Sequence, residues 1–357
     1  MPNSLVRVLH IANSLGLGGT EKVMQLFVTS LDRTHFLPAV YSPQNGERGA
    51  QLRHLGIDTY IGSDLLALLN KFQPHIVHIH RAGWTEPDQL KPMKLAKTPV
   101  VVETNVFGRH DPSPAAQVID RTLFVSNFCL KRFADTHGIA VKPPRYSFLY
   151  NPVDTDFFAA ASAKETDFTR PVAGRISRAD PGKWSHLALD ILPSLARDIP
   201  DFRYHVIGGI PQAHEFVHAN GLSGNVIFHD PVQTDAEIAE FMNGLSLLAH
   251  ANDTGESFGL VIAEAMACGL PVITHPCEGL KDNAQLELVD HGVTGLVAST
   301  TEEYVNAVKF LFSHPDEARR MGQAGKAKAA RLFRVQTVTK QLETIYLELL
   351  TQKGIMI

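Results

Sequence analysis

Two carboxylates, Glu256 and Glu264, flank a glycine-bearing turn that opens a short predicted helix. The helix is expected to stop at Cys268 and Gly269, and an apolar β-branched run follows from Pro271. The first N–H groups of a helix have no intrahelical acceptor and attract anions. If every intervening residue is helical, the carboxylates lie roughly 12 Å apart, beyond the roughly 5–9.5 Å between the acid and base of a glycoside hydrolase. The spacing favours one long ligand that is bound at both ends and has a phosphate at its centre.

A second candidate site follows the apolar run at residues 172–176. The chain there reads Gly174-Arg175-Ile-Ser-Arg178-Ala-Asp-Pro-Gly182-Lys183. At the carboxyl end of a parallel strand, Arg175 can clamp a pyrophosphate with its bidentate fork and Lys183 can act as a mobile point charge. Two basic residues in a loop are usually only solvated. Their agreement with the Glu256 and Glu264 pair favours the phosphate interpretation.

A glycine-rich turn, Gly16-Leu-Gly18-Gly19-Thr-Glu21, follows the first predicted strand. Glycines allow close approach of the backbone to a ligand. The turn is not the dinucleotide fingerprint, because Glu21 occupies the position of its last glycine and the second strand ends in Tyr41-Ser42 without an acidic residue. A nicotinamide site is therefore disfavoured, and a structural turn between strand and helix remains the alternative.

The elements that must position these residues alternate between apolar runs and helical patterns, as in parallel α/β sheets. Strands are predicted at residues 6–12, 37–41, 76–80, 100–103, 122–125 and near 147–150, then at 172–176, 204–208, 226–229, 245–250 and 271–274. Helices are predicted at residues 21–31, 64–72 and 127–137, and over the terminal stretch 335–350. A proline-bearing turn at residues 150–154 separates the two series, which predicts two doubly wound, Rossmann-like domains with ligand sites at the carboxyl ends of their strands.

Composition indicates a soluble globular protein large enough for two domains, with 357 residues, 44% hydrophobic and 20% charged. Cys129, Cys268 and Cys277 have no paired or reactive spacing, which suggests a reducing compartment. No charged and apolar leader precedes the first strand, and no run approaches the ~20 apolar residues of a spanning helix. We therefore expect a cytoplasmic protein.

Charge is distributed unevenly along the chain. Residues 1–150 contain 16 Lys and Arg against 11 Asp and Glu, a net +5, and residues 151–357 contain 17 against 26, a net −9; the two add to the −4 of the whole chain. The basic half could face an anionic acceptor or a membrane surface, although ordinary surface variation is the alternative. No basic run interleaved with aromatic residues indicates a nucleic-acid partner.

Taken together, these segments resemble the retaining glycosyltransferases of family 4. The resemblance covers most of the chain and is strongest at Glu256-x7-Glu264 with the following Ala-Met-Ala-Cys-Gly-Leu-Pro-Val272. Further matches are Gly18 to Glu21, Pro74-His-Ile-Val-His-Ile-His80, Val125-Ser126, Asn151-Pro-Val-Asp154, Gly174-Arg175, Asp290-His-Gly-Val-Thr-Gly295-Leu and the terminal helix. The order and spacing of these motifs are specific, whereas no single one is decisive.

The resemblance implies the GT-B architecture, with two facing Rossmann-like domains and a cleft between them. Residues 1–150 would form the acceptor side, joined by a terminal helix at about 338–357 that crosses back, and residues 151–337 would bind the nucleotide-sugar. Glu264 would hold the ribose hydroxyls and Glu256 would contact the transferred sugar. By position, Arg175 and Lys183 would bind the pyrophosphate, and Gly18 and Gly19 would close over it. The backbone N–H groups of Phe258, Gly259 and Leu260 would contact the sugar hydroxyls and the distal phosphate. Val232 would contact the base.

The chain also departs from the family pattern. Many members have a histidine after the strand equivalent to residues 100–103, where this chain has Thr104 and Asn105, and His110 could substitute only if the loop folds back. The gap between the basic residues of the phosphate loop is longer than usual, so Arg178 could share the phosphate role. Glu21 could contact substrate or cap its helix, and the acceptor-side segment 108–120 looks short.

Histidines His78 and His80 alternate on one predicted strand face, with His75 nearby. Packed or cleft-edge histidines are far more common than metal ligands, so we expect no metal site and no cofactor.

We therefore expect a metal-independent, retaining hexosyltransferase or other glycosyltransferase, with the nucleotide-diphosphate sugar as substrate. Its acceptor would be a hydroxyl of a glycan, a lipid-linked molecule or a small molecule, with peripheral membrane contact as an option. One alternative is another GT-B enzyme, either a nucleotide-sugar epimerase or a phosphorylase. A different alternative is a non-catalytic sugar-nucleotide-binding subunit. The sequence does not name the sugar, the base, the acceptor or the oligomeric state.

Overall fold

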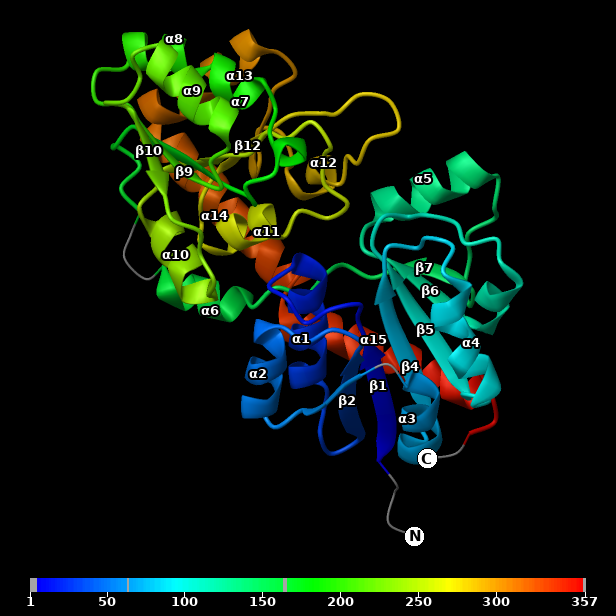
Figure 1. The fold of residues 1–357 in the computed structure, drawn as a ribbon. Helices are drawn as coiled ribbons and strands as arrows, with labels where there is room; N and C mark the ends of the chain where they lie inside the picture. The colour runs from blue at the N-terminus through cyan, green and yellow to red at the C-terminus, as the bar shows by residue number, and fades with distance from the viewer. Residues whose placement is uncertain (1–4, 63, 163–165, 356–357) are drawn as a thin grey trace. The chain divides into compact units, whose positions relative to one another are not determined.

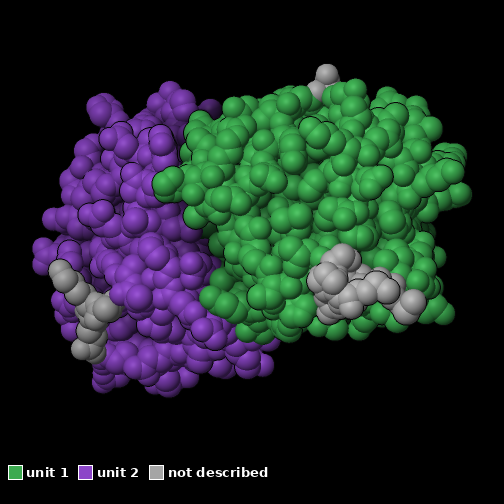
Figure 2. Space-filling view, turned by 90° about the horizontal axis from the view of Figure 1, so that it is seen from below, with its two compact units in different colours: residues 1–153, 335–357 green, residues 154–334 purple. Residues whose placement is uncertain are grey.

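The computed structural model describes residues 5–62, 64–162 and 166–355, and the chain divides into two compact units (Figures 1 and 2). Unit 1 comprises residues 1–153 and 335–357, and unit 2 comprises residues 154–334. The domain boundaries predicted from the sequence, after residues 150 and 337, each lie three residues from the boundaries between the two units. Where the chain leaves unit 1 and returns to it, the N–H of Val335 donates to the carbonyl of Val153 at 2.9 Å. The last two residues of the predicted return helix lie outside the described part of the chain.

Unit 1 is built on a parallel sheet of seven strands among the described residues, in the order β3-β2-β1-β4-β5-β6-β7. Its strands are β1 (Val6–Ile11), β2 (Phe36–Ser42), β3 (Asp58–Ile61), β4 (Ile76–Arg81), β5 (Val100–Asn105), β6 (Arg121–Phe124) and β7 (Tyr146–Phe148). Its helices are α1 (Gly19–Ser30), α2 (Glu47–His54), α3 (Leu65–Phe72), α4 (Pro87–Leu95), the 3₁₀ turn η1 (Pro114–Val118), α5 (Asn127–His137) and α15 (Val335–Gln352).

Unit 2 has a parallel sheet of six strands among the described residues, in the order β10-β9-β8-β11-β12-β13. Its strands are β8 (Val172–Ile176), β9 (Arg203–Ile207), β10 (Val226–His229), β11 (Leu247–Ala249), β12 (Val272–Thr274) and β13 (Gly295–Val297). Its helices are α6 (Thr155–Ala161), the 3₁₀ turn η2 (Pro181–Lys183), α7 (Leu187–Asp190), α8 (Leu192–Asp198), α9 (Pro211–Ala219), α10 (Asp235–Asn243), α11 (Leu260–Ala267), α12 (Gln285–Leu288), α13 (Thr301–Ser313) and α14 (Pro315–Leu332).

Several elements escaped the sequence analysis because their signals are weak. Strand β3 lies at the edge of its sheet and is only partly buried, so it needs no continuous apolar run. Helix α4 contains Pro92, which breaks the helical pattern, and α2 is almost wholly polar. Strand β13 has only three residues.

Both sheets are covered by helices on two faces, as buried parallel strands require. In unit 1, α3, α4 and η1 pack on the face that carries Leu9, Val77 and Val101, while α1 and α2 cover the other face. Helix α15, red in Figure 1, packs beside α1. In unit 2, α7, α8, α9 and α13 share one core with the strands, and α6, α10, α11 and α14 pack against one another.

In each sheet the strand order reverses beside the first strand of the unit, between β1 and β4 in unit 1 and between β8 and β11 in unit 2. At such a reversal the loops after the two strands diverge to opposite faces and leave a crevice at the carboxyl ends, where doubly wound sheets bind ligands. The predicted fold class, two doubly wound parallel α/β domains, is confirmed.

The close packing of α14 on the end of α11 predicts an asymmetric response to alanine at two helical glycines. A Cβ at Gly322 would lie 2.0 Å from the carbonyl oxygen of Gly269, whereas a Cβ at Gly325 would meet Met266 at 3.5 Å. We expect Gly322→Ala to cost about 1–3 kcal/mol by overpacking, which lowers the thermal midpoint by several degrees. The matched control Gly325→Ala should be neutral or stabilising, by up to about 1 kcal/mol. Equal midpoints for the two variants in a thermal melt would contradict the packing argument.

Candidate functional site

Glu256 lies at the centre of a polar cluster at the reversal point of unit 2. Lys183 follows β8, and its Nζ lies 3.2 Å from each carboxylate oxygen of Glu256. His250 and Asn252 follow β11, and they contact the same Oε1 atom through Nε2 at 3.2 Å and Nδ2 at 2.7 Å, respectively. The carboxyl ends of the two adjacent strands thus supply a cation, an imidazole and an amide to one carboxylate.

The surroundings of Glu256 keep it ionised. Burial by itself would raise the pKa of this carboxyl group, but the hydrogen bond and charge interaction with His250 and the positive charge of Lys183 outweigh burial and lower the pKa to about 2. The carboxylate is therefore an acceptor-only group at neutral pH, able to accept hydrogen bonds from hydroxyls. It is not a proton donor.

A rigid turn joins Glu256 to helix α11. Gly255 has a positive φ of 68°, and a Cβ there would lie 1.6 Å from the carbonyl oxygen of Asp282. The N–H of Glu256 donates to Gln285 Oε1 at 3.0 Å, and the hydroxyl of Ser257 donates to Asp282 at 2.8 Å. Gly259 caps the helix in the left-handed region, with φ 105°.

The helix itself begins only at Leu260 and ends at Ala267, with Cys268 as its C-cap. The stretch from Glu256 to Gly259 is therefore not helical, and the premise of an all-helical spacing between the carboxylates was wrong for that half of the segment. Glu264 lies in the second turn and is 2% exposed. The helix thus carries one buried carboxylate, and its N-terminus with Phe258, Gly259 and Leu260 follows directly on Glu256.

Arg175 is placed differently from a solvent-facing phosphate ligand. Its guanidinium carbon lies 3.6 Å from the ring centroid of Trp184, and Nη2 donates to the carbonyl of Lys183 at 2.7 Å and to Ser177 Oγ at 3.1 Å. Burial lowers the pKa of the Arg175 guanidinium. Electrostatic interactions with Tyr204 and with the buried tyrosine on α13 raise it by a smaller amount. Among the described residues, Nε and Nη1 of Arg175 have no hydrogen-bond partner. The side chain therefore braces the backbone that presents Lys183.

Arg178 and Val232 occupy the same carboxyl edge of the unit 2 sheet. Arg178 is exposed on the loop between β8 and η2. Val232 is half-buried in the loop between β10 and α10. Because β10 is separated from β8 by β9, Val232 belongs to a more distant part of the edge than the Glu256 cluster.

The glycine turn of unit 1 leads directly into α1, with Gly18 as N-cap and Gly19 as the first helical residue. The carboxylate of Glu21 folds back over the turn, since a Cβ at Gly18 would lie 2.2 Å from its Oε2, and Ser14 Oγ donates to its Oε1 at 3.0 Å. In this structure Glu21 therefore orders the turn, and the small size of Gly18 makes room for it.

Asn105 ends β5 and His110 lies on the segment after it, where the resemblance led us to look for a histidine. Asn105 is 2% exposed, and its amide bonds to the backbone of Arg109 in both directions, at 2.8 and 3.2 Å. The ring of His110 packs against Phe133 and His137 of α5, with centroids 5.8 and 5.2 Å away. Asn105 thus closes the loop on itself, and His110 is held toward α5.

Sequence reasoning missed three residues of the Glu256 cluster: His250, Asn252 and Gln285. A signal existed for the first two, because His250 is the last residue of the run predicted as a strand at 245–250 and Asn252 lies two positions beyond it, at the edge where ligands bind. Gln285 lies 29 positions beyond Glu256 and only the folded loop brings it there.

Comparison with known proteins finds similarity to glycosyltransferases. Residues 157–328, all within unit 2, match the family model described as glycosyl transferases group 1. The GDP-mannose-dependent alpha-(1-6)-phosphatidylinositol monomannoside mannosyltransferase of Mycobacterium tuberculosis is 29% identical over 242 residues, which are 62% of this chain and 60% of the relative. The matched region thus spans three fifths of that relative's length. These similarities support a glycosyltransferase.

Solved structures establish the architecture. The Anabaena protein HepE, crystallised with UDP and glucose, has a TM-score of 0.75 at 20% identity, with 95% of this chain and 98% of that chain covered. Sucrose-phosphate synthase from Thermosynechococcus elongatus has a TM-score of 0.70 at 17% identity, covering 97% and 99%. The fold is GT-B, as predicted. Within the described part of the chain, no helix is long and apolar enough to cross a bilayer.

The low pKa of Glu256 predicts a specific pH dependence of stability. Because its pKa in the folded protein is depressed to about 2, its ionisation stabilises the fold above the pKa of about 4.3 in the unfolded chain, and this contribution is lost as pH falls toward 2. We expect the difference in free energy of unfolding between wild type and Glu256→Gln to shrink by about 2 kcal/mol between pH 6 and pH 3. Denaturant titrations at both pH values measure it, and a pH-independent difference would show that the cluster does not lower the pKa of Glu256.

Proposed function

We propose that this protein is a retaining glycosyltransferase of family 4, which transfers a sugar from a nucleotide-diphosphate sugar to a hydroxyl acceptor without a metal ion or cofactor. The observation that carries the proposal is the contact between Glu256 and Lys183 at the reversal point of unit 2. It joins two of the segments on which the resemblance rests, within the unit that matches the glycosyltransferase family model.

The donor would be held along the loops around Glu256. The ionised carboxylate of Glu256 accepts hydrogen bonds from sugar hydroxyls, and Glu264 on α11 holds the ribose. Lys183, the exposed Arg178 and the N-terminal N–H groups of α11 meet the diphosphate. Val232 contacts the base. Two cations and a helix N-terminus offset the charge of a diphosphate, which is the basis for proposing metal independence.

Arg175 would act through its neighbours. Its hydrogen bond to the carbonyl of Lys183 and its stacking on Trp184 fix the loop that points the ammonium group at Glu256. Holding a cation in place before the reaction avoids reorganisation when charge develops. Arg175 is thus a positioning residue in this proposal, and Lys183 and Glu256 contact the donor.

In the proposed reaction, the bond between the anomeric carbon and the phosphate oxygen breaks and its electron pair leaves with the nucleoside diphosphate. The acceptor oxygen forms the new bond on the same face of the sugar, and the departing phosphate oxygen takes the acceptor's proton. No protein nucleophile is required. The protein contributes orientation and stabilisation of the negative charge on the leaving group, through Lys183, Arg178 and the α11 N-terminus.

The proposal also covers the acceptor, the cellular compartment and the roles of unit 1. In the proposal Gly18 and Gly19 contact the pyrophosphate of the donor, and unit 1 takes up a glycan, lipid-linked or small-molecule hydroxyl acceptor with Glu21. An anionic acceptor agrees with the net +5 of residues 1–150. We propose a cytoplasmic enzyme with peripheral contact to a membrane surface. A nucleotide-sugar epimerase, a phosphorylase and a non-catalytic subunit remain the competing functions.

The deciding experiment combines donor binding with product analysis. A thermal-shift screen with UDP, GDP, ADP and dTDP and their sugars, with and without EDTA, should show stabilisation by one nucleotide family that persists in EDTA and is lost in Glu264→Ala. NMR of the product formed with an acceptor panel should show the anomeric configuration of the donor. Inversion excludes retention, turnover without acceptor indicates an epimerase, a requirement for free phosphate indicates a phosphorylase, and binding without turnover indicates a non-catalytic subunit.

The phosphate role of the loop after β8 predicts a loss of affinity in Arg178→Ala. Charge-assisted hydrogen bonds contribute about 1.5–3 kcal/mol, so we expect the Kd for the preferred nucleoside diphosphate to rise roughly 10- to 100-fold, measured by calorimetry. Arg197→Ala is the matched control, because Arg197 is exposed on α8 and paired with Asp198. Equal affinities for both variants would remove Arg178 from the donor site.

A further inference from the structure

The two carboxylate oxygens of Glu256 are used unequally. Oε1 accepts hydrogen bonds from three donors, the ammonium of Lys183 at 3.2 Å, Nε2 of His250 at 3.2 Å and the side-chain amide of Asn252 at 2.7 Å. Among the described residues, Oε2 accepts from Lys183 alone, also at 3.2 Å. A carboxylate offers about four lone-pair sites on its two oxygens. Oε1 is therefore fully occupied, and Oε2 is the oxygen that can take a further hydrogen bond.

We infer that His250 is a positioning residue for the donor sugar. Its Nε2–H, together with the amide of Asn252, holds Oε1 of Glu256 so that Oε2 accepts a hydroxyl of the transferred sugar. The inference rests on the proposed function and adds a substrate class to it, because it requires a donor sugar with a free hydroxyl at the position that meets Oε2. His250 acts through Glu256 and does not itself contact the donor.

Lys183 is the contact of Glu256 for which a diphosphate can compete. The Lys183 side chain is 26% exposed, compared with 11% for His250, and its ammonium group lies at the same distance from both carboxylate oxygens. Lysine carries its charge on a flexible stem, so a bound diphosphate can draw it away from Oε2. His250 and Asn252 then keep Oε1 in place while Oε2 becomes available to the sugar.

The hydrogen bond to Glu256 fixes the position of a proton on His250. An ionised carboxylate only accepts hydrogen bonds, so Nε2 of His250 carries the proton. The other ring nitrogen, Nδ1, is buried and has no hydrogen-bond partner among the described residues. A buried polar atom without a partner destabilises the fold. This cost favours a role for His250 at the site over a purely structural one.

Both donors to Oε1 are held in place by the loops that carry them. The backbone N–H of His250 donates to the carbonyl of Ile273 on β12 at 2.8 Å, which fixes the chain at the end of β11. The backbone N–H of Asn252 donates to Nε2 of His275 at 3.1 Å. The contacts to Glu256 are therefore formed before a ligand arrives, as a preorganised binding site requires.

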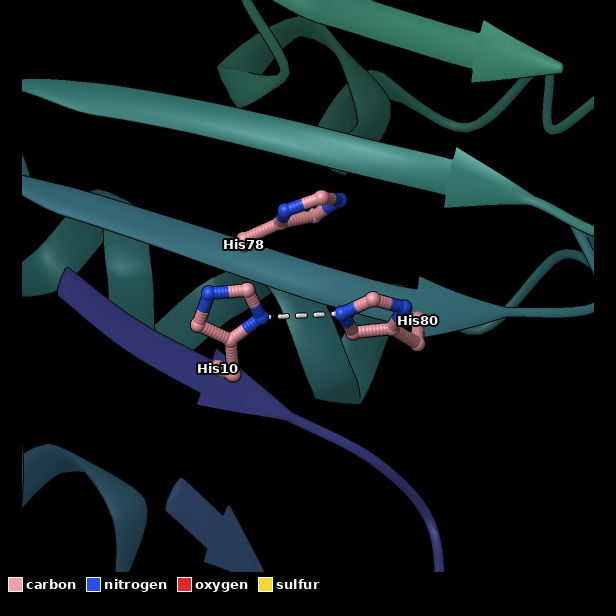
Figure 3. Close-up of side chains that lie close together, drawn as sticks. All are labelled: His10, His78 and His80. Atoms are coloured by element: carbon pink, nitrogen blue, oxygen red, sulfur yellow. Dashed lines mark hydrogen bonds between the residues drawn. The ribbon is translucent and has the colours of Figure 1, made fainter. Parts of the chain in front are cut away.

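The buried histidines of unit 1 are placed differently. His10 on β1 and His78 and His80 on β4 lie on one face of the sheet, with ring nitrogens within 4.8 Å of one another (Figure 3). Chiefly because of burial, the pKa of His10 and of His78 is well below the usual value and that of His80 is about 3, so all three are neutral at pH 7. Their hydrogen bonds in the described part of the chain go to uncharged groups, namely one another, Tyr346 and Thr104. They orient no carboxylate, in contrast to His250.

The test compares two ligands of the full-length protein, the tightest-binding sugar among the UDP, GDP, ADP and dTDP sugars and its parent nucleoside diphosphate. In the proposal Glu256 meets only the sugar. His250→Leu should therefore raise the Kd of the nucleotide-sugar roughly 10-fold and change that of the nucleoside diphosphate by less than about twofold, measured by calorimetry. His250→Gln should restore most of the affinity, because the glutamine amide can reach the position of Nε2 and donate to Oε1.

A second variant and a control accompany this comparison. Asn252→Ala removes the other donor to Oε1 and should cause the same selective loss, which keeps the test valid if His250→Leu folds poorly in a thermal melt. The control is His218→Leu, since His218 is exposed on α9, and both Kd values should stay unchanged. A series of monodeoxy nucleotide-sugars identifies the hydroxyl. Loss of the one that meets Oε2 should weaken binding to the wild type roughly 10-fold and to His250→Leu by clearly less.

The outcomes separate this inference from the proposed function. The inference is overturned if His250→Leu binds the nucleotide-sugar as tightly as the wild type, if it weakens both ligands equally, or if His250→Gln is impaired as much as His250→Leu. It is also overturned if every deoxy analogue loses the same factor in the wild type and in His250→Leu. In these cases the wild type still binds a nucleotide-sugar and the proposed function stands. A wild type that binds no nucleotide-sugar contradicts the proposed function and this inference with it.

Discussion

The adjacency of β8 and β11 is the constraint on which the candidate site depends. These strands are distant in sequence but neighbours in the sheet, because the order reverses beside the first strand of unit 2. The loops that follow them bring Lys183 to Glu256 across 73 residues of chain. A sheet with a simple sequential order would separate the two loops and leave each with an unpaired, partly buried charge, which is costly.

In unit 2, a buried charged side chain is either paired with an opposite charge or held by hydrogen bonds and aromatic stacking. Glu256 is ionised because Lys183, His250 and Asn252 all contact it, and the turn that carries it is fixed by further hydrogen bonds. Arg175 has no carboxylate partner among its described contacts and instead lies on Trp184 and donates to backbone and hydroxyl oxygens. The arrangement holds polar groups in place before a ligand arrives, which is what stabilisation of a leaving group requires.

The equivalent reversal of strand order in unit 1, between β1 and β4, is lined by uncharged side chains instead of paired charges. Its interior layer there is made of neutral imidazoles, and the ion pairing lies further along, where Arg81 bonds to Glu103 at 2.6 Å and to Asp111 at 2.8 Å. That network and Asn105 shape the loop after β5. Helix α15 is tied to the same layer by Tyr346, so the segment that returns to unit 1 is fixed by a polar contact as well as by apolar packing.

The sequence by itself determined the fold class, the alternation of strands and helices, and the segments that carry chemistry, because buried parallel strands and glycine turns leave strong local patterns. It placed Glu256, Glu264, Arg175 and Lys183 on the right elements. Only the tertiary structure decided what these side chains touch. Arg175 lies inward against Trp184, Asn105 bonds within its own loop, and His10 lies beside His78 and His80. These contacts depend on strand order and helix packing, which the local periodicity of the sequence does not specify.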